Sequence, residues 1–261
     1  MCSILQLSSL SADYNPSGFR RIPLDELTVR KIGIIQPCYL PWRGFFDFVH
    51  EVDVFVFLDD VQYTVRDWRN RNRIKSKDGG TLWLTVPVVG GRNQEIRDVK
   101  IDNSQPWIRK HLASLEHSYG RLEHFREYID VLSSVYAVGF ESLSELDVAL
   151  TKALCKCLGV ETEFVLASTL GSEGKKDDKL LAIVKRLGGD AYVSGPSAAA
   201  YLRPELWQEA GVRLLYKDYS GYPEYPQIAP PFAPGVSIVD TLFMLGKAAP
   251  DYIWGRYRTV A

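Results

Sequence analysis

Three features are scarce in this sequence, and each scarcity excludes a class of protein. The chain holds four cysteines, Cys2, Cys38, Cys155 and Cys157, without the spacing of a disulfide framework or a metal site. Its four histidines are scattered and form no HExxH arrangement. Its apolar runs are too short to cross a bilayer, and its first residues lack the basic region of a secretory signal. We therefore expect a reduced, cytoplasmic protein without a metal and without a membrane partner.

A strong net charge is also missing. The 31 basic and 32 acidic residues leave a formal net charge of -1, so no global field favours nucleic acid or an anionic membrane. The composition, 46% hydrophobic and 24% charged, is typical of a globular protein. These values favour a small-molecule substrate over nucleic acid.

The pattern of the chain changes near residue 30. Residues 1–30 have little periodicity and predict an irregular N-terminal extension, whereas buried strands and helices alternate over 31–261. We expect main strands at 31–36, 54–58, 163–167, 191–194 and 212–216, and short ones within 81–88 and 98–102. The intervening helices predict a single α/β domain with a Rossmann-like, mostly parallel sheet. A helical insertion, or subdomain, is expected at about 104–159.

The first candidate site follows the first strand. Gln36, Tyr39 and Trp42 lie in a turn with two prolines, at the end of a strand where open α/β sheets bind ligands. The aromatic rings either form the walls of a pocket or seal the core. Cys38, in the same turn, has no histidine near it in sequence, and a buried, inert cysteine is the usual case.

The second candidate site follows the second strand. Asp59 and Asp60 stand at its carboxyl end, where paired carboxylates hold a proton, an amine or Mg²⁺, or else cap a turn. A polar run then supplies hydroxyl, guanidinium, amide and ammonium groups: Tyr63, Arg66, Arg69, Asn70, Arg71, Asn72, Arg73 and Lys75. Such a run binds a phosphorylated substrate or forms a solvated face.

Two later segments are weaker candidates. Ser194 and Gly195 follow a strand and can offer hydroxyl and amide groups to an anion, or can form a tight turn. The proline-rich stretch after residue 217 predicts a covering loop, with Tyr225, Gln227 and Asp240 on its inner side.

Six segments together resemble the WbqC-like protein family. They are IGIIQPCYLPWRGFFDFV, DVFVFLDDVQYTVRDWRNRNRIK, LWLTVPV, LGGDAYVSGPSAAAYL, YPEYPQ and FAPGVSIVDTLFMLG. The family is associated with bacterial surface polysaccharide biosynthesis, and the resemblance implies transfer of glycine, another amino acid or an acyl group onto an amino sugar. It assigns site positions to Gln36, Tyr39, Trp42, Asp59, Asp60, Tyr63, Arg71, Asn72, Lys75, Ser194, Gly195, Gln227 and Asp240.

The opening strand, Gln-Pro turn and helix also resemble, more distantly, the HUP-type nucleotidyltransferases. Those enzymes carry a paired-histidine motif at the helix start, where this sequence has Arg43-Gly44-Phe45-Phe46. The departure argues against ATP-dependent adenylylation. The fold implied by both resemblances is Rossmann-like and HUP-like.

We therefore expect an enzyme, a transferase that joins an acyl or aminoacyl group to an amine of a small, nucleotide-linked sugar or related metabolite. Asp59 or Asp60, with Tyr63, would be catalytic, and Arg71, Asn72 and Lys75 would hold phosphates or an oxyanion. The alternatives are an ATP-using ligase or nucleotidyltransferase with a modified HUP-like site, and a non-enzymatic binding or scaffold protein of a biosynthetic complex. The sequence leaves the cofactor unknown and is compatible with a homo-oligomer.

Overall fold

A five-stranded parallel sheet forms the centre of the molecule. The computed structural model describes residues 29–91 and 93–254, so most of the expected N-terminal extension lies outside the described residues. The sheet contains β1 (Lys31–Ile35), β2 (Val54–Phe57), β7 (Glu163–Leu166), β8 (Ala191–Ser194) and β9 (Arg213–Tyr216). Its strand order is β7-β2-β1-β8-β9, and all four neighbouring pairs are parallel. The predicted α/β fold is confirmed.

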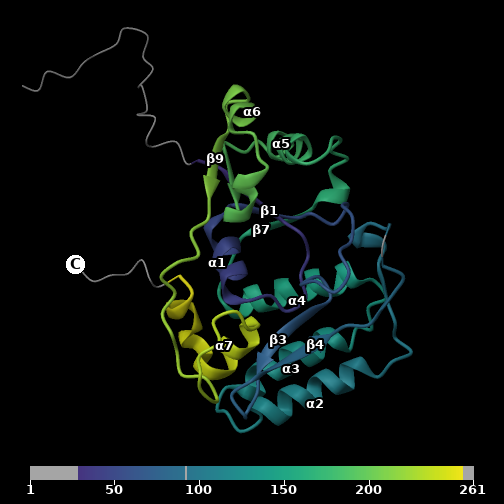
Figure 1. Cartoon of the computed structure of the whole chain (residues 1–261), viewed down its shortest axis with the longest axis vertical. Helices are drawn as coiled ribbons and strands as arrows, with labels where there is room; N and C mark the ends of the chain where they lie inside the picture. The colour runs from purple at the N-terminus through teal and green to yellow at the C-terminus, as the bar shows by residue number, and fades with distance from the viewer. Residues whose placement is uncertain (1–28, 92, 255–261) are drawn as a thin grey trace, which may run out of the picture.

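Helices cover both faces of this sheet (Figure 1). On one face lie α1 (Arg43–Glu51) and α4 (Leu143–Cys157), and on the other lie α5 (Asp177–Arg186) and α6 (Pro204–Glu209). Side chains alternate along each strand, so Val54 and Val56 of β2 pack toward α5 while Phe55 and Phe57 pack toward α1. A sheet that is buried on both faces needs apolar residues at successive positions. This requirement explains the uninterrupted apolar runs of the sequence.

The chain leaves β1 toward one edge of the sheet and later returns to the other side of it. It adds β2 and then β7 on one side of β1, and afterwards adds β8 and β9 on the opposite side. The direction of winding therefore reverses between β1 and β8. Beyond the carboxyl ends of two such strands the connecting segments diverge, which leaves room for a ligand.

Three consecutive helices separate β2 from β7 in the chain. They are α2 (Trp107–Tyr119), α3 (Phe125–Tyr136) and α4. Ser142 caps the start of α4, because its hydroxyl accepts from Glu145 N at 3.4 Å. The Ser104 side chain precedes α2 but does not cap it. Ser104 donates its hydroxyl to Asp102 at 2.5 Å instead, and the helix begins after Pro106.

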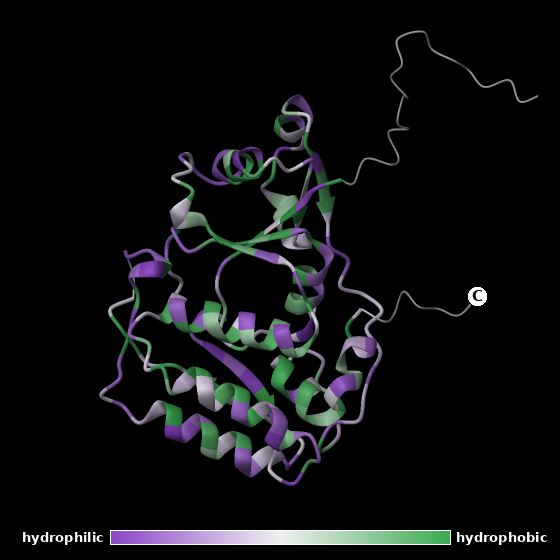
Figure 2. Cartoon of the chain, turned by 180° about the vertical axis from the view of Figure 1, so that it is seen from behind, coloured by the Kyte–Doolittle hydropathy of each residue, from purple (hydrophilic) through white to green (hydrophobic). Residues whose placement is uncertain are grey.

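The remaining strands form two small antiparallel sheets of two strands each. One pairs β3 (Arg71–Lys75) with β4 (Thr81–Thr85), and the other pairs β5 (Val88–Val89) with β6 (Lys100–Ile101). The sequence pattern did not predict β3, which is hydrophilic over most of its length (Figure 2). Short 3-10 turns connect other elements: η2 (Ile96–Asp98), η3 (Ala167–Thr169), η4 (Pro196–Ala200) and η5 (Gly246–Tyr252).

The last helix, α7 (Ile238–Leu245), returns the chain to the turn that follows β1. Ser237 N donates to Arg73 O, and Ile238 N donates to Pro41 O, both at 2.8 Å. These bonds place an early turn, the β3 strand and a late segment side by side. Within the described part of the chain, no helix is long and apolar enough to cross a membrane.

Candidate functional site

A cavity of about 710 Å³ opens beyond the carboxyl ends of β1 and β8, where the winding of the sheet reverses. Its walls come from the turn after β1, the start of the β3–β4 hairpin, the turn after β8 and the loop before α7. The lining residues are Ile34, Ile35, Gln36, Cys38, Pro41, Trp42, Phe45, Leu58, Trp68, Arg69, Asn72, Arg73, Leu180, Tyr192, Ser194, Gly195, Pro196, Ser197, Ala198, Tyr201, Tyr219 and Gly235. A largely apolar cavity with a few polar groups is typical of a small-molecule site.

A second hollow, of about 760 Å³, lies between α2 and α3 and is less suited to a ligand. It is a shallow depression on the surface, and both signs of charge border it, with Arg109 and Arg126 near Glu116 and Asp130. It is not lined by any residue of the parallel sheet or of the turns that follow its strands. The cavity at the strand ends is therefore the candidate site.

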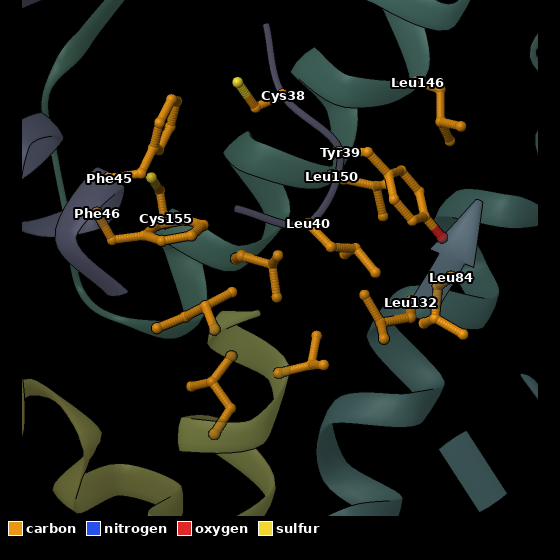
Figure 3. Close-up of a cluster of buried hydrophobic side chains, with 14 of the residues drawn as sticks. Cys38, Tyr39, Leu40, Phe45, Phe46, Leu84, Leu132, Leu146, Leu150 and Cys155 are labelled. Carbon is orange, nitrogen blue, oxygen red and sulfur yellow. The ribbon is translucent and has the colours of Figure 1, made fainter. Parts of the chain in front are cut away.

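The turn after β1 is held rigidly against the β3 strand. Leu40 adopts a left-handed backbone with φ of 41°, and Asn72 Nδ2 donates to Leu40 O at 2.8 Å and to Tyr39 O at 3.3 Å. Tyr39 N donates to Trp68 O at 3.0 Å. The side chains of Cys38, Tyr39 and Leu40 fan out from this turn toward the core (Figure 3). Asn72 thus borders the cavity while its amide fixes the backbone of the turn.

Gln36 and Trp42 are the two sequence-predicted residues of this turn whose side chains border the cavity. The Trp42 ring packs against Tyr219 with ring centroids 5.3 Å apart. Tyr39 points away, is fully buried and forms a hydrogen bond between its hydroxyl and His111 Nδ1 at 2.8 Å. The sequence allowed the aromatic rings of this turn either to form the wall of a pocket or to seal the core. Trp42 forms a wall of the cavity, and Tyr39 is part of the core.

Cys38 borders the cavity but is not activated. Burial raises the pKa of its thiol to about 12, and the charge of Arg69 offsets only part of this effect. The thiol donates weakly to Gln36 O at 3.4 Å. A thiol that stays protonated is a poor nucleophile, in agreement with the expectation from sequence.

Two arginines of the polar run supply the positive charge of the cavity. Arg69 pairs with Asp67 at 2.7 Å, whereas the guanidinium of Arg73 has neither an ion pair nor a hydrogen bond with any described residue. The cavity lining contains no carboxylate among the described residues. The site therefore offers an unpaired cation to a ligand and has no anion of its own to neutralise it.

Ser194, the last residue of β8, and Gly195, which follows it, both border the cavity. The sequence predicted a ligand-binding position for both residues because they lie at the end of a strand. Ser194 is buried, and its hydroxyl donates to the Tyr192 hydroxyl at 3.3 Å. Gly195 has an extended backbone, and a side chain there would meet nothing within 4 Å. The turn therefore leaves open space beside Gly195, on the cavity side of the sheet.

The predicted catalytic carboxylates lie outside the cavity lining. Asp59 accepts from Ser168 N at 2.9 Å and from the Ser168 hydroxyl at 2.6 Å, which caps the η3 turn. Asp60 pairs with Lys179 at 2.8 Å. Tyr63 is buried, its hydroxyl has no partner among the described residues, and burial raises its pKa to about 12. None of the three borders the cavity, and their catalytic roles stay predictions.

The remaining predicted residues also lie outside the lining. Arg71 stacks on Trp83 with its guanidinium carbon 4.4 Å from the ring centroid, and Lys75 Nζ donates to Gly79 O at 2.6 Å. Asp240 accepts from the hydroxyls of Tyr119 and Tyr225, each at 2.7 Å, and from Gln227 Nε2 at 2.8 Å. Burial raises the pKa of Asp240, partly offset by these bonds. Lys75, Gln227 and Asp240 therefore hold the hairpin and the covering loop in place, whereas the guanidinium of Arg71 lies against an exposed ring.

Sequence reasoning missed one buried acid altogether. Asp147 of α4 is fully buried, and neither of its carboxyl oxygens has a hydrogen-bond partner among the described residues. Burial raises its pKa far above the ordinary value, against the charge of Arg69. The Thr151 hydroxyl, one turn later, is unpartnered in the same way. A polar residue inside a mostly apolar helix was the signal that marked this position.

The described residues contain no cluster of the side chains that usually bind metals. Across residues 29–91 and 93–254, no three or more His, Cys, Asp and Glu side chains are grouped so that they could hold a metal ion. Gln36, Arg73 and Ser194 can instead contact a ligand through hydrogen bonds and charge. The site is therefore equipped for binding and orienting an anion-bearing molecule.

Comparison with known proteins gives one family and one relative. A family model described as the WbqC-like protein family matches residues 36–252. An uncharacterized protein of Mycobacterium tuberculosis (strain ATCC 25618 / H37Rv) is 41% identical over 228 residues, which covers 86% of this chain and 98% of that protein. No solved structure matches the chain significantly.

Proposed function

The chain belongs to the WbqC-like protein family, and we propose that it is a transferase for a small, phosphate-bearing metabolite. In this proposal it joins an acyl or aminoacyl group, of the glycyl type, to an amine of a nucleotide-linked sugar or related molecule. The observation that carries the proposal is the unpaired guanidinium of Arg73 beside a cavity at the reversal point of a parallel sheet. Guanidinium groups bind phosphate and carboxylate oxygens through paired N–H donors.

The size and composition of the cavity support a small ligand. A volume of about 710 Å³ lies within the range of small-molecule sites. Aromatic rings of Trp42 and Tyr219 give it rigid walls, and Gln36 can both donate to and accept from a ligand. This combination suits a polar metabolite with an anionic end.

The proposed reaction depends mainly on positioning. The amine nitrogen attacks the acyl carbon, the bond from that carbon to the leaving group breaks, and the leaving group departs with the amine proton. Arg69 and Arg73 stabilise the negative charge that develops on the carbonyl oxygen or on a departing phosphate. Among the described residues the lining has neither a carboxylate nor a histidine, so an activated donor suits this site better than strong base catalysis.

Product formation tests the proposal directly. Purified protein is incubated with acyl and aminoacyl donors and with amine-bearing nucleotide sugars, and mass spectrometry follows the acceptor. Arg73→Gln should lower kcat/KM by about 10- to 100-fold, since it removes charged hydrogen bonds to the ligand. The matched control is Arg213→Gln on the exposed edge strand β9, which should leave turnover unchanged. Full activity in Arg73→Gln would contradict the assignment.

The general base is a separate question. Asp59 and Asp60 stay predictions for this role, and the contacts of Asp59 with Ser168 favour a supporting role instead. Under the supporting role, Asp59→Asn lowers the melting temperature and leaves kcat within about threefold, because a lost cap costs roughly 1 kcal/mol. Loss of turnover with an unchanged melting temperature would identify Asp59 as the base.

The strand order favours a second candidate, an ATP-using ligase or nucleotidyltransferase. In open α/β sheets nucleotides bind where the winding reverses, and the cavity lies at that place. ATP consumption with release of pyrophosphate would distinguish this enzyme from the transferase. A scaffold protein would show neither activity, and no small molecule would raise its melting temperature. For all three we propose the cytoplasm, in keeping with the free thiols of Cys38, Cys155 and Cys157.

A further inference from the structure

Two tryptophans are exposed at the mouth of the cavity. Trp68 and Trp83 have 41% and 43% of their surface accessible, although tryptophan normally buries most of its ring. Their ring centroids are 5.6 Å apart, and their planes differ by 32°. Trp68 precedes the β3 strand and Trp83 lies in the middle of β4, so the β3–β4 hairpin presents both rings together. Neither ring is needed to fill the core, which leaves their surface free for a ligand.

Two arginines stack on the same rings. Arg71 lies over Trp83 with its guanidinium carbon 4.4 Å from the ring centroid. Arg73 is 5.6 Å from the Trp83 centroid and 5.8 Å from the Trp68 centroid. Neither arginine has a carboxylate partner among the described residues. Two other cations of the run differ, since Arg69 pairs with Asp67 and Lys75 is turned inward onto Gly79 O.

We propose that Trp68, Trp83, Arg71 and Arg73 form a stacking platform for the base of a nucleoside diphosphate. The exposed rings supply flat apolar faces, on which a planar base can stack. The unpaired guanidinium groups supply the charge that phosphate oxygens require. A neutral sugar would use the rings alone and would leave both cations unmatched. The combination therefore selects a ligand that carries a planar ring and phosphates together.

The platform is continuous with the cavity. Trp68 and Arg73 belong to the cavity lining, while Trp83 and Arg71 lie beyond it. Arg73 and Trp83 are direct cross-strand neighbours, so their side chains share one face of the hairpin. A base stacked on Trp83 places its phosphates near Arg73, and the group attached to the phosphates then enters the cavity. The platform thus binds the nucleoside diphosphate part of the substrate, and the cavity binds the group that reacts.

A single-stranded nucleic acid is the main competitor for such a surface, since it also stacks on aromatic rings. Two observations favour the mononucleotide. The platform holds two rings rather than a long track, and it leads into a cavity of about 710 Å³, which is the size of a small-molecule site. The net charge of -1 also provides no extended basic field for a polymer.

Calorimetric titration of the full chain tests the platform without any acyl donor. The probes are UDP, CDP, ADP and GDP, with inorganic pyrophosphate as the probe that lacks a base. At least one nucleoside diphosphate should bind about 10-fold tighter than pyrophosphate or better, and Trp83→Ala should abolish that difference. Trp83→Phe keeps a ring and should retain most of it. Arg71→Gln should weaken both probes, because it removes charge and not a ring.

Leu82→Ala is the matched control, because Leu82 is equally exposed on the same strand but faces away from Trp83. It should leave every affinity unchanged, and melting curves should show that all variants are folded. Equal affinity for pyrophosphate and nucleoside diphosphates, or an unchanged preference in Trp83→Ala, would overturn the platform. Tighter binding of a short oligonucleotide would overturn it in favour of a nucleic-acid surface.

The platform deepens the proposed transferase and rests on it for the identity of the attached group. The two ideas nevertheless fail separately. If no acyl transfer occurs, the preference for nucleoside diphosphates and its loss in Trp83→Ala still stand. If transfer occurs and Trp83→Ala turns over the same substrate with an unchanged KM, the platform is wrong and the transferase remains.

Discussion

At the scale of single residues, the most unusual group is the carboxyl of Asp147. It lies fully buried in α4 without a hydrogen-bond partner among the described residues. Burial raises its pKa well above the ordinary value. The folded chain therefore keeps a proton that the unfolded chain releases. This difference links the stability of the fold to pH.

The sign of that link is a testable prediction for Asp147→Asn. Because the folded pKa is raised, the contribution of Asp147 is fully present below about pH 4, the unfolded value, and is lost as the pH rises through the folded pKa. Urea unfolding between pH 4 and pH 8 should show a decline in the natural protein that the asparagine variant lacks. Asp130→Asn, at an exposed position of α3, should keep the decline. Parallel curves for Asp147→Asn and the natural protein would contradict this account.

A second residue links stability to pH in the opposite direction. Burial lowers the pKa of His111 to about 4. The neutral ring fits its surroundings, since Nε2 lies 3.1 Å from Thr85 O and Nδ1 lies 2.8 Å from the Tyr39 hydroxyl. The contribution of neutral His111 to the stability of the fold is fully present above the pKa of the residue in the unfolded chain, near 6.5. It is lost as the pH falls toward the folded pKa of about 4.

His111→Gln should therefore reduce the acid sensitivity of the fold. The natural protein should lose stability on the order of 2–3 kcal/mol between pH 6.5 and pH 4 through this group, and the variant should not. His117→Gln, an exposed change later in α2, serves as the control. NMR titration of the imidazole gives an independent check, and a folded pKa near 6.5 would refute the prediction.

At the scale of elements, β1 depends on a close approach to α1. A side chain at Gly33 would lie 2.5 Å from Phe48 Cε1 and 3.1 Å from Val52 Cγ1, both inside a packed core. Gly33→Ala should destabilise the fold by about 1–3 kcal/mol through overpacking. Gly195→Ala, where nothing lies within 4 Å, should stay within about 0.5 kcal/mol. Chemical denaturation measures both, and equal stabilities of the two variants would show that α1 moves freely against the sheet.

The elements also show how far the sequence alone can lead. The central strands β1, β2 and β8 were predictable because burial on both faces demands apolar runs, as in Val54–Phe57. The edge strands β7 and β9 are more exposed and were predicted from short β-rich runs alone. The β3 strand was not predictable, because its Arg, Asn and Lys residues have the composition of a solvated loop. Only its pairing with β4 shows that the segment is a strand. The pairing of β7 with β2 was equally hidden, since three helices separate these strands.

The cavity lining was predictable by position and not by side-chain direction. Gln36, Ser194 and Gly195 were found because they follow strands, and they border the cavity. Asp59 follows a strand as well, but its oxygens bind Ser168, a residue more than one hundred positions away. A sequence shows which polar groups end near a sheet edge. It does not show which of them find partners elsewhere in the fold.

At the scale of the whole molecule, the segment after β9 is fixed without regular secondary structure. Between β9 and α7 no helix or strand is formed, yet Lys75 Nζ donates to Pro231 O at 2.5 Å and Gln227 Oε1 accepts from Ala233 N at 2.8 Å. Arg43 of α1 donates to Pro223 O at 2.7 Å. Side chains from distant elements thus provide the hydrogen bonds that a helix or strand would provide internally.

Lys75→Met should loosen this segment. The change removes the donor to Gly79 O and Pro231 O, and leaving buried carbonyls unpaired costs about 1–3 kcal/mol. Limited proteolysis should cut the variant between residues 217 and 235, where the natural protein resists. Lys77→Met, at an exposed position of the same hairpin, should remain resistant. Equal cleavage of both variants would mean that other contacts hold the segment.

The bonds from Ser237 and Ile238 to Arg73 and Pro41 also have a consequence for synthesis of the chain. Strand β1 leaves the ribosome early, but its neighbour β8 and the segment that closes the cavity are made more than 150 residues later. Contacts so distant in sequence form slowly and late. A nascent chain that stops short of Ser237 lacks the bonds to Arg73 O and Pro41 O, so a metabolite that binds only the finished cavity cannot stabilise it.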